Sequence, residues 1–109
     1  MSDLKAITKA LIEFRDQREW QQFHNPKDLS IALGIEAAEL QECFLWKASE
    51  EASSARVKEE LADVLAYALL LAAHYDFDPI AIITEKMIKN GQKYPIDKSK
   101  GNALKYTDF

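Results

Sequence analysis

The sequence has few features of a secreted or membrane-spanning protein. Cys43 is the one cysteine in 109 residues, which excludes an intramolecular disulfide and a cysteine-based zinc site. The longest uninterrupted apolar run, Val64 to Ala73, has ten residues, well short of the roughly 20 that cross a bilayer. The N-terminus lacks the charged and then apolar pattern of a signal peptide. We therefore expect a cytoplasmic protein that has no membrane partner.

Glycine and proline are also few, and the net charge is not positive. With three Gly, three Pro and 48% apolar residues, the composition is that of a compact folded chain, not of a disordered one. Fourteen basic residues stand against eighteen acidic ones, a net charge of -4, which argues against a nucleic-acid partner. The length favours a single domain over residues 1–109. The core of so small a domain is marginal, so we expect association of subunits.

Apolar residues at three- and four-residue spacing predict an all-α fold with a four-helix core. The expected helices cover residues 3 to about 19, about 28 to 48 and about 79 to 93, with a third helix between the last two that is marked by apolar residues from Val57 to Ala72 and has His74 in its last turn. Asp28, either Ser53 or Ser54, and Asp78 are the expected caps of the last three helices. The tail from about residue 96 is expected to be irregular. The third helix is apolar on nearly every side after Asp63, which indicates the middle of a bundle or a subunit interface, and hence a homodimer or homotetramer.

Acidic residues interrupt the apolar faces of two of these helices. Glu36 and Glu39 lie three residues apart, so that their side chains are neighbours on the second helix. Glu60 and Asp63 repeat the arrangement on the third. If the two helices are antiparallel neighbours, all four carboxylates converge, and only cations can offset their repulsion. Oxygen ligands of this kind favour Mg²⁺, with Mn²⁺ as an alternative, and Mg²⁺ also binds substrate phosphates.

Two other interpretations of these acids have to be weighed. In the first, they belong to surface salt-bridge rows, because paired glutamates are common on helices. In the second, they form a ferritin-like di-iron site, which needs Glu-x-x-His twice. Neither His24 nor His74 follows a glutamate by three residues, so the second interpretation fails. His74 lies in the last turn of a helix and receives no functional assignment.

The two acidic pairs, separated by twenty residues, resemble the metal-binding signature of the all-α nucleoside triphosphate pyrophosphohydrolases of the MazG type. The resemblance covers almost the whole chain and is closest to the dCTP pyrophosphatase type. The segments that carry it are Phe14-Arg15-Asp16, Glu19-Trp20, residues 22–26, residues 44–47, Lys86-Met87, Asn90, Tyr94-Pro95 and residues 105–107.

The resemblance implies hydrolysis of (deoxy)nucleoside triphosphates between the α and β phosphates, to a monophosphate and pyrophosphate. Metal ions held by Glu36, Glu39, Glu60 and Asp63 would supply the catalysis, so no protein nucleophile is required. Cys43 is accordingly expected to be a buried structural thiol. The resemblance further implies assembly as dimers or dimers of dimers, with active sites that draw on more than one chain.

Base and phosphate contacts are predicted from the aromatic and basic residues. Trp20, His24, Trp46 and Tyr67 are the candidates for the base. Trp46 follows Glu39 by seven residues, or two helical turns, which predicts an indole about 10 Å from the carboxylates. The candidates for the phosphates, on the fourth helix, are Lys86, Asn90, Lys93 and Tyr94.

Simpler roles remain open for all these residues. Tryptophans often pack in a core or an interface, and the lysines would also suit a solvated helix face. The whole protein could instead be a non-catalytic helical oligomerisation module whose carboxylates pair with basic residues of a partner subunit.

Overall fold

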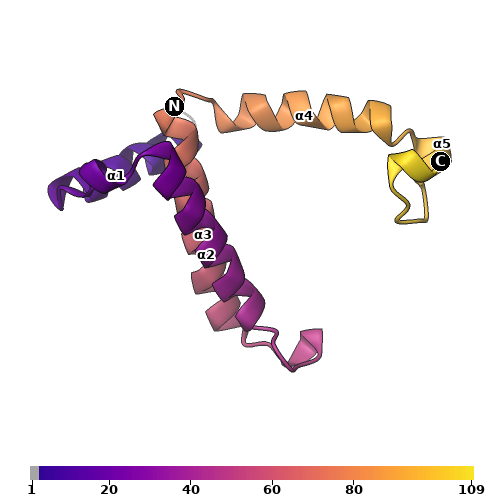
Figure 1. Cartoon of the computed structure of the whole chain (residues 1–109), viewed down its shortest axis with the longest axis horizontal. Helices are drawn as coiled ribbons and strands as arrows, with labels where there is room; N and C mark the ends of the chain where they lie inside the picture. Colours follow the sequence, from indigo (N-terminus) through magenta and orange to yellow (C-terminus); the bar gives the residue numbers. More distant parts are fainter. Residues whose placement is uncertain (1–2) are drawn as a thin grey trace. The chain divides into compact units, whose positions relative to one another are not determined.

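The computed structural model describes residues 3–109, and these residues form helices and no β-strand (Figure 1). This confirms the all-α prediction. One compact unit reaches to Asp76, and a second comprises Phe77–Phe109. The α-helices are α1 (Asp3–Gln17), α2 (Pro26–Glu42), α3 (Ser54–His74), α4 (Pro79–Lys93) and α5 (Ile96–Ser99), and the 3₁₀ turns are η1 (Trp20–Phe23), η2 (Ser49–Glu51) and η3 (Tyr106–Asp108).

The first unit is built around the pair α2 and α3. Figure 1 shows the two helices side by side and running in opposite directions, joined by the loop of residues 43–53. Helix α1 packs against α3. Leu29, Cys43, Leu70 and Ala72 are the buried apolar residues of this unit. The antiparallel pair meets the condition for convergence of the acidic residues, and the buried thiol of Cys43 is confirmed.

Helix α2 begins two residues earlier than predicted, and Asp28 is not its cap. Asn25 is the cap, since its side-chain oxygen accepts from the backbone N–H of Asp28 at 2.9 Å. Proline at the first helical position explains the difference. Pro26 holds the preceding residue in an extended conformation, which is the conformation of a cap, and its missing N–H would be unpaired there anyway.

Helix α2 also ends earlier, at Glu42 and not near residue 48. The backbone N–H groups of Phe44 and Leu45 bond to carbonyls three residues back, which tightens the chain into turns. Trp46 then has a φ of 61°, a left-handed conformation that cannot continue a right-handed helix. The apolar run 44–46 therefore belongs to a loop. The prediction that Trp46 lies two helical turns along the same face from Glu39 is wrong.

Local caps account for the starts of α3 and α4, which were predicted correctly. The Ser53 side chain accepts from the Arg56 N–H at 3.4 Å, and the Asp78 side chain accepts from the Ile80 N–H at 3.0 Å. Helix α1 ends at Gln17, two residues early, because Glu19 adopts a φ of 53°. The η1 turn that follows was not predicted.

The second unit consists of α4 and the C-terminal tail. Several large apolar side chains of α4 are more than half exposed, among them Ile80, Ile83, Met87 and Ile88. The tail is largely irregular, as expected, but contains the short elements α5 and η3. Within residues 3–109, no single helix is long and apolar enough to cross a membrane, although α3 and α4 taken together reach the required length and composition.

Candidate metal centre and adjoining pocket

The antiparallel pair brings acidic side chains from both helices together. Helix α2 contributes Glu36 and α3 contributes Glu60 and Asp63, and one carboxylate oxygen from each lies within 4.8 Å of the others. Glu36 and Glu60 are partly buried, and Asp63 is exposed. We call these three residues the carboxylate triad. Oxygen atoms so close together can share one cation.

Two oxygens of the triad lack hydrogen-bond partners among residues 3–109. Glu36 Oε2 and Glu60 Oε2 are buried and have no hydrogen-bond partner among the described residues. The positive charge of Arg56 lowers the pKa of Glu60, but this is the smallest of the effects on that pKa. Because a buried carboxylate oxygen without a donor is unfavourable, the pair of unused oxygens fits a hard divalent cation. The same observation argues against a surface salt-bridge row.

Glu39 lies outside the triad but interacts with it. A hydrogen bond with Glu36 is the largest cause that raises the pKa of Glu39 above its ordinary value, and the negative charge of Glu36 adds to it. Burial is the first cause that raises the pKa of Glu60, followed by a hydrogen bond with Glu39 and by the charges of Glu39 and Asp63. Mutual repulsion therefore extends over all four predicted carboxylates.

A pocket of about 210 Å³ adjoins the triad and shares Asp63 with it. We call it the aromatic pocket. Three of the four predicted base contacts, Trp20, His24 and Tyr67, line it together. The remaining lining residues are Leu11, Phe14, Arg15, Ala66 and Leu70. A ligand that fills this pocket therefore touches a residue of the triad.

The pKa values of two polar groups in the aromatic pocket are shifted by their surroundings. Burial and the nearby charge of Arg15 lower the pKa of His24, so that its imidazole is neutral at pH 7. Its Nδ1 is buried and has no hydrogen-bond partner in the described part of the chain. Burial and the charges of Glu36 and Asp63 raise the pKa of Tyr67, so that its hydroxyl keeps its proton. The His24 and Tyr67 rings meet edge to face at 6.2 Å.

Arg15 is a pocket residue that the sequence analysis missed. It follows Leu11 by four residues and so falls on the apolar face of α1. The reasoning that singled out Glu36, a charged residue within an apolar stripe, would have found Arg15 as well.

Comparisons with known proteins identify the family of the chain. The sequence model of the MazG-like family matches residues 31–109, most of the chain. The chain belongs to the MazG-like family. This confirms the family that the acidic pairs and the aromatic segments predicted.

Relatives of the MazG-like chain are similar along nearly its full length. The protein dCTP pyrophosphatase 1 from Rattus norvegicus is 41% identical over 97% of this chain and 67% of its own length. Its counterpart from Homo sapiens is 38% identical with the same coverage. A crystal structure of a pyrophosphatase from Archaeoglobus fulgidus has a TM-score of 0.81 and 39% identity, covering 87% of this chain and 94% of that one.

Trp46 of this MazG-like protein does not reach the aromatic pocket within the chain. It lies in the loop of residues 43–53, and its side chain is 93% exposed. Such exposure rules out the simpler role that was left open for it, packing in the core of the subunit.

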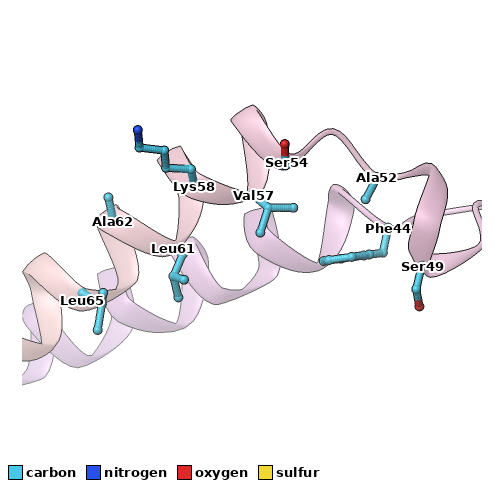
Figure 2. A pocket seen from close by; sticks show the side chains of 9 residues that line it. All are labelled: Phe44, Ser49, Ala52, Ser54, Val57, Lys58, Leu61, Ala62 and Leu65. Carbon is cyan, nitrogen blue, oxygen red and sulfur yellow. The ribbon is translucent and has the colours of Figure 1, made fainter.

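A second hollow in the first unit is apolar. Figure 2 shows Val57, Leu61 and Leu65 pointing the same way from α3, with Lys58 and Ala62 turned away from them. The hollow measures about 600 Å³, and its further lining residues are Phe44, Ser49, Ala52 and Ser54. We call it the apolar groove. Its lining is mostly apolar, so it offers a packing surface.

The predicted phosphate contacts all belong to the second unit. Lys86, Asn90 and Lys93 lie on α4, and Tyr94 caps its end. Lys93 lines a pocket of about 560 Å³ and its ammonium lies 5.1 Å from the ring of Tyr106. The other lining residues are Lys89, Gln92, Pro95, Lys98, Tyr106 and Phe109, of which Lys89 and Lys98 were not predicted.

Proposed function

We propose that this protein hydrolyses (deoxy)nucleoside triphosphates, with dCTP or a related deoxynucleotide as substrate, between the α and β phosphates. The observation that carries the proposal is the carboxylate triad beside an aromatic pocket, with Asp63 in both. The names of the relatives, dCTP pyrophosphatase 1 and a pyrophosphatase, support it. The products would be a nucleoside monophosphate and pyrophosphate, and the role would be housekeeping of the cytoplasmic nucleotide pool by a single domain over residues 1–109.

The triad and Glu39 would hold Mg²⁺, with Mn²⁺ as an alternative. The unpartnered buried oxygens of Glu36 and Glu60 fit such an ion. When bound, a divalent ion supplies neutralisation of the triphosphate charge and activation of water. Glu39 is the proposed fourth ligand, because it interacts with both Glu36 and Glu60; a hydrogen bond with Glu36 is the first cause of its raised pKa, and a cation would offset the charge of Glu36 that adds to it.

The remaining predicted residues have proposed roles in binding the nucleotide. Trp20, His24 and Tyr67 would enclose the base in the aromatic pocket. The exposed Trp46 would contact the base only from a neighbouring subunit. The proposed phosphate contacts are Lys86, Asn90, Lys93 and Tyr94.

A homodimer or homotetramer is part of the proposal. The apolar groove on α3 and the exposed apolar face of α4 both present surface that a second subunit would cover. Assembly would also let one subunit complete the site of another.

Product analysis tests the proposed reaction. Purified protein, Mg²⁺ and dCTP should give dCMP and pyrophosphate in equal amounts, and no dCDP. Asp63→Asn should lower kcat at least a hundredfold while the helix content stays near that of the wild type, because the amide removes a charged ligand. Glu59→Gln, an exposed neighbour on α3 outside the triad, is the control and should keep full activity. A non-catalytic module would produce no dCMP and would bind neither Mg²⁺ nor nucleotide in calorimetric titration.

A further inference from the structure

A single arginine lines the aromatic pocket, and one edge of its guanidinium is paired with Asp16. The Arg15 side chain is 20% exposed, and its Nε donates to Asp16 Oδ1 at 2.9 Å. Its Nη2 lies 2.9 Å from the same oxygen. Asp16 therefore holds one edge of the planar guanidinium, through Nε and Nη2, and leaves the Nη1 edge outside this ion pair. An arginine held in this way is prepared to recognise a matching pair of acceptors.

The other walls of the pocket suit a small flat ring. Phe14 and Trp20 meet edge to face at 6.0 Å, and Leu11 and Leu70 add aliphatic surface. The volume of about 210 Å³ is below the roughly 300–1,000 Å³ of pockets that hold a whole ligand. The pocket would thus take one part of a nucleotide, and a single-ring pyrimidine fits such a space better than a two-ring purine.

We propose that Arg15 determines base specificity by donating hydrogen bonds to O2 and N3 of cytosine. This inference rests on the proposed function, since it names the base that the same site selects. O2 and N3 of cytosine are adjacent acceptors, and paired acceptors match the donors of a guanidinium fork. Thymine and uracil carry an N–H at position 3, which would face a donor. The buried Nδ1 of His24 offers the ring a second polar contact.

Binding of monophosphates without metal tests Arg15 apart from catalysis. In calorimetric titration with EDTA present, the wild type should bind dCMP more tightly than dTMP. Arg15→Lys keeps the charge and loses the fork, so it should reduce this preference about tenfold, within the range of one bidentate base contact. Lys9→Gln, an exposed residue of the same helix outside the pocket, is the matched control and should leave the preference unchanged.

The ratio of kcat/KM for dCTP and dTTP provides the second measurement, and melting curves identify any variant that unfolds. An equal loss of dCMP and dTMP binding in Arg15→Lys would assign Arg15 to the phosphate and overturn the inference. An unchanged preference would overturn it too. Failure of the proposed function looks different, because the wild type would then hydrolyse no nucleotide with Mg²⁺, while the metal-free titrations would still decide the role of Arg15.

Discussion

At the scale of single residues, Glu39 combines a raised pKa with a place beside three other carboxylates. A carboxyl group with a raised pKa is harder to ionise in the folded chain than in the unfolded chain. Its contribution to stability is therefore present below the ordinary value of 4.5 and is lost as the pH rises through the raised value. The metal-free protein should be strained at neutral pH by the charges that a cation would neutralise.

Glu39→Gln should accordingly raise the melting temperature of the metal-free protein at pH 7. The gain should disappear below about pH 4.5, where the wild-type carboxyl is itself protonated. With Mg²⁺ the sign should reverse, because ligand binding stabilises the folded wild type and the variant has lost a ligand. Differential scanning calorimetry in EDTA and in Mg²⁺, over pH 4 to 8, measures both effects.

The exposed Glu59→Gln is the control for this series and should shift neither curve. His24 has a lowered pKa, so its own contribution is present above its ordinary value of 6.5 and is lost as the pH falls through the lowered value. Because both proteins contain His24, the difference between their curves isolates Glu39. A lower melting temperature for Glu39→Gln in EDTA at every pH would contradict the proposed repulsion.

At the scale of the helices, the cap of α2 makes a local contribution that can be measured. The Asn25 side chain accepts from the Asp28 N–H and donates to the Asp28 carboxylate at 2.7 Å. Asn25→Ala should cost about 1 kcal/mol, or a fall of about 4 °C or more in melting temperature. Gln21→Ala, exposed in the preceding turn, should change it little. An unchanged melting temperature for Asn25→Ala would show that the cap does not hold the helix start.

The helices also show which structure the sequence determines locally. Ser53 and Asp78 each precede a clear apolar repeat, so the starts of α3 and α4 could be predicted. Asn25 and Asp28 both have side chains that can cap, and the choice between them depends on Pro26. The end of α2 could not be predicted, because no glycine or proline marks it.

The candidate site also has features that could be predicted from the sequence and features that could not. Helical spacing predicted the two acidic pairs, and the antiparallel contact of α2 and α3 brings three of the four acids, Glu36, Glu60 and Asp63, together. Arg15 was named only within the segment Phe14-Arg15-Asp16 that carries the resemblance, and it received no role in the site. The left-handed backbone at Trp46 has no signal in the sequence, so the position of its indole could not be predicted.

At the scale of the whole molecule, the uncovered apolar surface predicts association. Light scattering at micromolar concentration should give the mass of a dimer or a tetramer. Leu65 is 55% exposed and lines the apolar groove, so Leu65→Asp should shift the mass toward that of a monomer by burying a charge in the contact. Circular dichroism should show that the helix content is retained.

Glu59→Lys, which changes a charge on the exposed side of the same helix, is the control and should keep the oligomeric mass. A wild type that runs as a monodisperse monomer would contradict the proposed assembly. If the wild type is an oligomer and Leu65→Asp leaves its mass unchanged, the groove is not the contact surface.

Asp63 belongs to the carboxylate triad and also lines the aromatic pocket. An occupant of the pocket and an ion on the triad would therefore act on the same side chain, and each would change the free energy of binding of the other. Such coupling is reciprocal, so that whatever factor the ion adds to the affinity for the base, the base adds to the affinity for the ion. Where this coupling differs from one base to another, selectivity among nucleotides would depend on the identity and the free concentration of the divalent ion in the surrounding medium.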